Sequence, residues 1–124
     1  MSEFVTNIEE VTLRNNDYRN VIYTSPNLMQ LVIMNIAPED HIGWEVHEGT
    51  DQFVRVEYGN GLAIIDRNIY KLTNGTAVVI PAGSYHDIVN TSLTDPLKIY
   101  LIYSPPQHRS HLIQKVNPRS MKHS

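Results

Sequence analysis

Two stretches of the sequence decide the fold: residues 43–59, GWEVHEGTDQFVRVEYG, and residues 75–90, GTAVVIPAGSYHDIVN. Both contain short alternating apolar runs, rich in β-branched residues, that are bounded by glycine- and proline-containing turns. This pattern is typical of short β-strands. Both stretches also place histidine, carboxylate or amide side chains within these runs. They therefore predict strands that bring a few polar groups together in an apolar interior.

Similar apolar runs cover most of the remaining chain. No 12-residue window carries the apolar stripe of an amphipathic helix, and turn-forming residues recur roughly every 8–12 residues, as in a small sandwich, jelly roll or closed barrel. The sequence thus predicts an all-β protein without internal repeats. The expected strands are residues 20–24, 28–36, 41–47, 52–58, 61–66, 76–81, 86–90 and 97–103.

Length and composition are those of one ordinary globular domain. The chain has 124 residues and no cysteine. The missing cysteines exclude disulfides, Cys-ligated zinc and thiol nucleophiles, so that any metal must be bound by His, carboxylate or amide groups. No apolar run approaches the ~20 residues of a membrane helix, and the N-terminus does not resemble a secretory signal. We expect a cytoplasmic protein that does not associate with a membrane.

The charge is distributed unevenly along the chain. Residues 107–124 contain four basic residues and no acidic one, whereas residues 1–106 contain six basic and thirteen acidic residues. Because the strand pattern also stops after Pro106, we place the folded domain at residues 1–106 and a basic C-terminal tail at residues 107–124. We interpret the tail as a solvated segment that ends the fold, with contact between the tail and the acidic body as an option. The acidic body does not favour nucleic-acid binding.

A group of four polar side chains is predicted to converge in the interior. Glu45 and His47 are two residues apart and share one face of a strand. If the turn at residues 48–51 closes a hairpin, Gln52 lies beside His47, and the turn before His86 delivers a second imidazole. Buried polar groups cost several kcal/mol unless they are satisfied, and a divalent cation satisfies all four. The alternatives are structural histidines, and a Gln52 that orients Glu45 by a hydrogen bond.

These two stretches resemble the two sequence motifs of the cupins. Counted back from the closing glycine Gly59, Gln52 occupies the position of the cupin glutamate, and His47 and Glu45 occupy those of the two histidines. In the second stretch, all of the characteristic positions match: Gly75, Pro81, Gly83, His86 and Asn90. The resemblance implies a single-domain cupin β-barrel, also called a double-stranded β-helix or jelly roll, with motif one at residues 43–59 and motif two at residues 75–90.

The resemblance is most specific to small type-2 cupins described as mannose-6-phosphate-isomerase-like, and it covers nearly the whole chain. It implies a homodimer with one divalent transition metal per barrel, either iron, manganese, nickel or zinc, bound by Glu45, His47, Gln52 and His86. The family label does not itself establish an activity. The chain departs from the family after Pro106, where Arg109-Ser110 replaces a short Pro/Gly loop.

Three kinds of function are compatible with such a barrel. One is a metal-dependent enzyme, isomerase-like or dioxygenase-like, that acts on a small sugar or other oxygen-rich metabolite. Its candidate catalytic bases are Glu57 and, if it does not bind the metal, Glu45. Another is a non-catalytic sugar-binding module, metal-free or with a vestigial site. The third is a structural dimer whose interior site is vestigial. Gln30, a lone amide in an apolar strand, either lines the ligand cavity or bonds nearby backbone. The remaining histidines, His41, His108, His111 and His123, are expected at the surface or rim.

Overall fold

The fold consists of two antiparallel β-sheets that face each other, as seen in a computed structural model that describes residues 3–119. One sheet has six strands in the order β6-β3-β8-β2-β1-β9, and the other has three in the order β5-β4-β7. This arrangement confirms the predicted all-β jelly roll. The described elements are α1 (Ile8–Arg14), β1 (Arg19–Ser25), β2 (Met29–Ile36), β3 (Asp51–Tyr58), β4 (Gly61–Ile65), β5 (Asn68–Leu72), β6 (Ala77–Ile80), β7 (His86–Asn90), β8 (Leu97–Ser104) and β9 (Ile113–Gln114).

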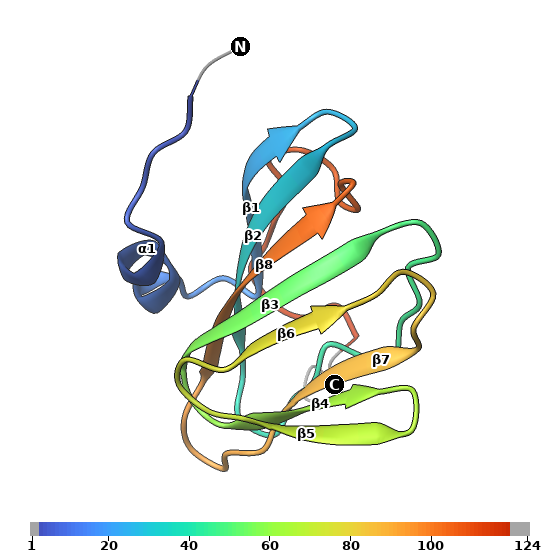
Figure 1. The fold of residues 1–124 in the computed structure, drawn as a ribbon. Coiled ribbons are helices and arrows are strands. Elements are labelled where there is room, and N and C mark those ends of the chain that lie inside the picture. The colour runs from blue at the N-terminus through green and yellow to red at the C-terminus, as the bar shows by residue number, and fades with distance from the viewer. Residues whose placement is uncertain (1–2, 120–124) are drawn as a thin grey trace.

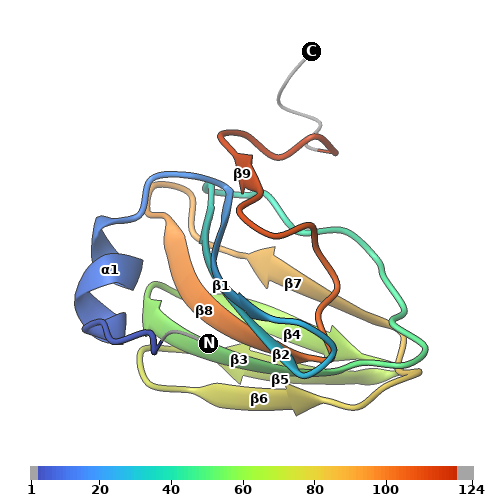
Figure 2. The ribbon, with the colours of Figure 1, turned by 90° about the horizontal axis from the view of Figure 1, so that it is seen from above.

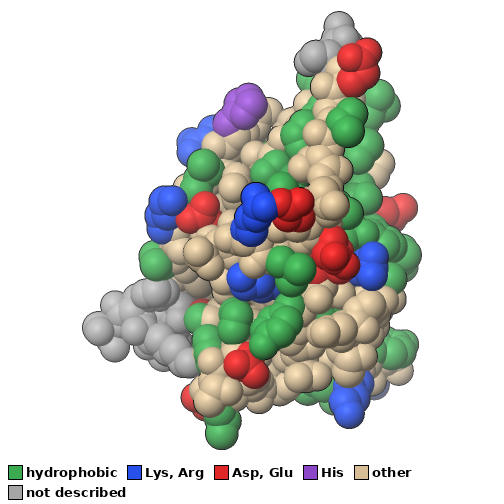
Figure 3. Space-filling view, turned by 90° about the vertical axis from the view of Figure 1, so that its left-hand side faces the viewer, with side chains coloured by type: hydrophobic (Ala, Val, Ile, Leu, Met, Phe, Trp, Pro, Cys, Tyr) green, Lys and Arg blue, Asp and Glu red, His purple; other side chains and the backbone are tan. Residues whose placement is uncertain are grey.

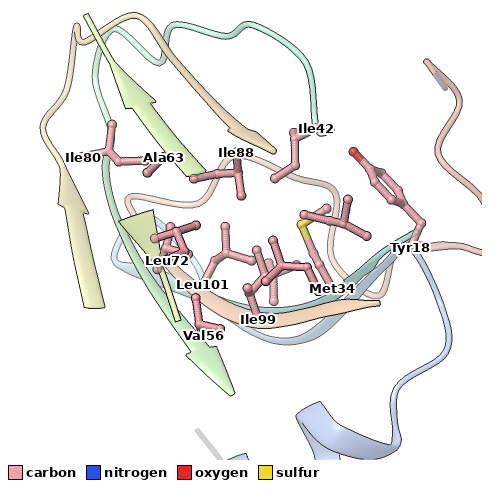
Figure 4. Packing of buried hydrophobic residues seen from close by; sticks show 14 of the residues in the cluster. Tyr18, Met34, Ile42, Val56, Ala63, Leu72, Ile80, Ile88, Ile99 and Leu101 are labelled. Atoms are coloured by element: carbon pink, nitrogen blue, oxygen red, sulfur yellow. The ribbon is translucent and has the colours of Figure 1, made fainter. Parts of the chain in front are cut away.

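The apolar core lies between the two sheets (Figure 4). Strand β8 illustrates how the sequence builds it, because every second residue from Leu97 to Tyr103 is buried and the intervening side chains face outward. The facing strand β7 contributes Ile88 from the smaller sheet. Fully buried residues include Val32, Met34, Ile36, Val54, Val56, Ala63, Leu72, Leu97, Ile99 and Leu101.

Helix α1 packs on the outer face of the six-stranded sheet, away from the second sheet (Figures 1 and 2). The Asn7 side chain caps its first turn by accepting a hydrogen bond from the Glu10 N–H at 2.9 Å. The sequence pattern gives no sign of α1, because a helix of seven residues with one buried side chain, Thr12, is too short for a recognisable apolar stripe. Acidic and basic side chains are interspersed over this face (Figure 3). Within the described residues, no helix is long and apolar enough to cross a membrane.

Two strand predictions differ from the structure. Residues 41–47 form only isolated bridges to β7, at His41 and Glu45. The regular ladder breaks at Gly43, whose φ is +107° and whose N–H donates to the Asp87 carboxylate rather than to a neighbouring strand. Strand β5 was not expected, because Leu72 alone among its five residues is buried and the sequence has no alternating pattern there.

Residues 107–119 are mostly exposed, and they lean on the acidic body through ion pairs of Lys115 with Asp17 and of Arg119 with Glu45. They run back across the molecule, and β9 adds to the edge of the large sheet by pairing with β1 (Figure 2). Two further backbone hydrogen bonds join this segment to the β1 region: Tyr18 donates to Lys115 and Val21 donates to Leu112. The segment thereby brings Arg119 over the region that contains Glu45.

Candidate metal centre

Glu45 and His86 are held side by side by the backbone. Each N–H donates to the carbonyl oxygen of the other residue at 2.9 Å, the reciprocal pattern of an antiparallel bridge. The side chains of such a pair lie on the same face of the sheet. His86 Nδ1 also lies 2.9 Å from the Ser84 carbonyl oxygen. Since a carbonyl only accepts, Nδ1 must carry the proton, which leaves the lone pair of Nε2 free to bind a metal ion.

His47 completes a group of three ligand residues. Its Nε2 lies 4.0 Å from Glu45 Oε1, and its ring centroid is 5.4 Å from that of His86. One potential ligand atom from each of Glu45, His47 and His86 lies within 4.8 Å of the others. Burial lowers the pKa of His47, and the nearby Glu45 carboxylate acts in the opposite direction. A lowered pKa favours the neutral imidazole, the form that binds metals.

Gln52 faces the same interior, but the hairpin considered for residues 48–51 does not place it there. Residues 48–51 do not close a hairpin, because they connect the smaller sheet to β3 in the larger sheet, where Gln52 pairs with Ile80 and Tyr103. Gln52 nevertheless faces inward and is 3% exposed. The prediction of a hairpin was wrong, although Gln52 is buried as the interior site requires.

Several buried polar atoms in this interior have no hydrogen-bond partner among residues 3–119. They include His47 Nε2, Gln52 Oε1 and His86 Nε2. Unsatisfied buried acceptors cost on the order of 1–3 kcal/mol each. Two imidazole nitrogens, an amide oxygen and the Glu45 carboxylate are donor atoms that divalent transition metals accept, so these residues fit a bound metal ion.

Arg119 was not identified from the sequence as part of this region. Its Nη2 lies 3.5 Å from Glu45 Oε2, so the basic segment neutralises the one acidic side chain of the cluster. The Glu45 side chain remains 24% exposed, and the Arg119 side chain is 49% exposed. The ion pair is therefore at the mouth of the site, where solvent weakens it. Only the excess of basic residues after position 106 hinted at such a contact.

His108 lies at the rim of this interior, in keeping with the expected surface or rim position: the residue is partly exposed, although its Nε2 is buried. Its ring packs against Tyr103 at 5.2 Å between centroids, and the His47 ring contacts the same tyrosine at 5.8 Å. His108 Nε2 is buried without a partner among the residues that the structure describes. Burial lowers the pKa of His108 to about 4, with smaller contributions from the charges of Arg19 and His47. The imidazole is therefore neutral at pH 7.

The lowered pKa predicts a dependence of stability on pH. The unfolded chain gains a proton on His108 near pH 6.5, whereas the folded protein does so only at about pH 4. The free energy of unfolding is therefore at its full value above pH 6.5 and falls as the pH drops toward 4. Between pH 7 and 4.5, the free energy of unfolding of wild type should therefore fall by about 2 kcal/mol more than that of His108→Phe, which has no imidazole to titrate at this position. This value allows for the partial solvent exposure of His108. Urea unfolding of both proteins, with a chelator present, measures this difference. The prediction is contradicted if the free energies of unfolding of wild type and His108→Phe change equally with pH.

Gln30 has a structural role in placing His108. It is fully buried, its amide group donates to Thr24 Oγ1 and to the His108 carbonyl, and its oxygen accepts the backbone N–H groups of Gln107 and His108. All four hydrogen bonds are thus internal. Of the two roles that the sequence left open, the geometry favours backbone bonding over contact with a substrate.

Glu57 does not join the cluster. Alternation along β3 points Gln52, Val54 and Val56 inward and Glu57 to the opposite face. There its Oε1 lies 3.8 Å from Nη2 of Arg55. The geometry therefore contradicts Glu57 as a base for chemistry in the barrel, and it leaves Glu45 as the one candidate carboxylate of the two.

The fold and the inward-facing cluster define a class of protein: small antiparallel barrels with a potential metal site inside. Comparison with known families identifies the class further, because the Cupin domain family matches residues 32–103. The chain belongs to the cupin family.

Relatives of similar sequence extend this assignment over most of the chain. The uncharacterized protein L612 of Acanthamoeba polyphaga mimivirus is 44% identical over 120 residues, covering 94% of this chain and 74% of L612. YrkC of Bacillus subtilis, also uncharacterized, is 38% identical over 85% of this chain and 59% of its own length. The crystal structure of BH2720 from Bacillus halodurans superposes with a TM-score of 0.88 at 37% identity, covering 92% of this chain and 89% of that protein.

Proposed function

We propose that this cupin binds one divalent transition metal ion through Glu45, His47, Gln52 and His86. The observation that carries the proposal is the set of buried acceptors on His47, Gln52 and His86 that lack partners within residues 3–119, next to a carboxylate. Iron, manganese, nickel and zinc all suit this set of two imidazoles, one carboxylate and one amide oxygen. The hydrogen bond from His86 Nδ1 to Ser84 supports the proposal further, since it holds the ring as a neutral ligand requires.

We further infer that the site acts on a small, oxygen-rich metabolite such as a sugar. A bound divalent ion would supply Lewis acidity to an oxygen atom of that ligand. The residues of the chain provide the surroundings: the core side chains exclude water, and Tyr103 packs edge to face against the rings of His47 and His108. Neutral His108, with a free Nε2, can accept a hydrogen bond or a proton from a ligand hydroxyl.

Metal analysis tests this proposal directly. Protein purified without added metal should contain about one equivalent of a transition metal, and Glu45→Gln, which removes the anionic ligand, should reduce that content strongly. Glu57→Gln is the matched control, because this glutamate lies on the opposite face of β3. The proposal is refuted if wild-type protein contains no metal and its melting temperature does not change with a chelator or with added iron, manganese, nickel or zinc.

A second candidate function is a non-catalytic sugar-binding barrel, and one observation favours it. In the described part of the chain, Glu45 is the one carboxylate of the cluster, and it is engaged by Arg119. If Glu45 also binds the metal, no carboxylate remains in the cluster to act as a base. A chelator-treated protein whose melting temperature rises with glucose or mannose would support this function over an enzymatic one.

A further inference from the structure

Arg19 is a buried cation near the candidate metal centre. It lies at the start of β1, is 7% exposed, and is two residues from the core residue Val21, so both side chains are on the inner face of the strand. Its guanidinium is 5.0 Å from the centre of the Tyr18 ring. Tyr18 itself lies at the end of the core near Met34 and Ile42 (Figure 4). Arg19 thus presents a full positive charge to the apolar interior.

No acidic side chain within residues 3–119 pairs with this charge. The one hydrogen bond that the Arg19 side chain makes to a described residue runs from Nη1 to the neutral amide oxygen of Gln114, across the β1–β9 pair. Its Nε is buried and has no partner there. Buried charges are strongly unfavourable unless they are paired. The contact with the Tyr18 ring offsets part of this cost but supplies no anion.

Arg19 and the candidate metal ligands border the same core. Its neighbour Tyr18 belongs to the buried cluster that also contains Tyr103. The rings of His47 and His108 both contact Tyr103, which is buried between the two sheets. An unpaired cation and an unpaired set of metal-binding atoms therefore adjoin one buried cluster.

We propose that Arg19 binds the carboxylate of a small organic acid that enters the barrel beside the metal centre. The inference deepens the proposed function, on which it rests, by naming the class of ligand. The Nε–Nη2 edge of a guanidinium matches the two oxygens of a carboxylate, and one such group balances the single charge of Arg19. Phosphate, a dianion with three acceptor oxygens, usually requires several cationic donors, whereas Arg19 has no second cation paired beside it among the contacts described above.

The test compares anion binding by wild type and Arg19→Met. Thermal unfolding is followed with sodium acetate, glycolate, malate or gluconate against sodium chloride at equal ionic strength, and with glucose and glucose 6-phosphate. At least one carboxylate should raise the wild-type melting temperature more than chloride does, and glucose should have a smaller effect than gluconate. The apparent affinity for that carboxylate should fall about tenfold or more in Arg19→Met, as expected for loss of a charge-assisted pair.

Control variants separate a binding role from a structural one. Arg67→Met removes an exposed arginine and should respond to carboxylates like wild type. Arg19→Met should be at least as stable as wild type in urea without anions, since it loses an unpaired charge. If it does not fold, Arg19→Lys takes its place: it keeps the charge but loses the planar edge, and should bind the same carboxylate more weakly.

Three outcomes would overturn the proposal. The first is that no carboxylate raises the melting temperature of wild type, and the second is that wild type responds to glucose 6-phosphate alone. The third is an equal response to carboxylates in Arg19→Met, or in Arg19→Lys where that variant replaces it. Repeating the carboxylate series on chelator-treated protein distinguishes this proposal from the metal proposal. An Arg19-dependent response in protein that never contains metal would support the anion site while refuting the metal site.

Discussion

Replacing His86 with alanine is expected to weaken the binding of a divalent transition metal ion by about 100-fold or more, since even a residue that only orients a ligand is worth 10- to 100-fold. His86 supplies a buried Nε2 whose ring is oriented by Ser84. The purified variant should therefore contain almost no metal. Plasma mass spectrometry measures the content, and circular dichroism checks that the β-fold persists.

The control for this variant is His111→Asn. His111 is exposed and has a φ of +62°, a conformation that asparagine tolerates better than alanine does. The control should retain the metal content of wild type. Full metal occupancy in His86→Ala would show that the site lies elsewhere in the molecule.

Replacing Asn90 with alanine is expected to reduce the free energy of unfolding by about 3 kcal/mol. Asn90 is 1% exposed, and its side-chain nitrogen donates to the carbonyl oxygens of Ile36, Ala37 and Asp95, while its oxygen accepts from the Ser92 N–H. Alanine leaves these backbone groups without partners where water has little access. The side chain ties the end of β7 to the end of β2 and to the loop before β8.

Urea unfolding of Asn90→Ala beside Asn60→Ala measures this effect. Asn60 is exposed, so its replacement should change the free energy of unfolding by less than about 0.5 kcal/mol. Equal stabilities for the two variants would mean that the hydrogen bonds of Asn90 do not hold the loops together.

The parts of the site that the sequence predicts depend on local rules. Glu45 and His47 share a face because side chains alternate along extended chain, and this holds even though residues 41–47 form isolated bridges rather than a full strand. The turn Pro81–Ser84 similarly delivers His86 to the first position of β7. These local rules orient each of the three side chains, whereas the bridge between Glu45 and His86, which are far apart in the sequence, brings the two segments together.

The parts that the sequence did not predict depend on contacts between distant segments. The His108 ring packs against Tyr103 because the amide of Gln30, 78 residues earlier in the chain, holds the His108 backbone. Arg119 reaches Glu45 because β9 pairs with β1. The predicted hairpin at residues 48–51 failed for the same reason, since short-range patterns do not reveal which sheet a strand joins. A lone glutamine within an apolar strand was the one available hint for His108.

The contact between Arg119 and Glu45 has a practical consequence for how the protein is prepared. A purification tag joined to the chain shortly after Arg119 would begin close to a side chain that contacts a candidate metal ligand. A polyhistidine tag in that position would bring competing imidazoles close to the centre whose metal content is to be measured.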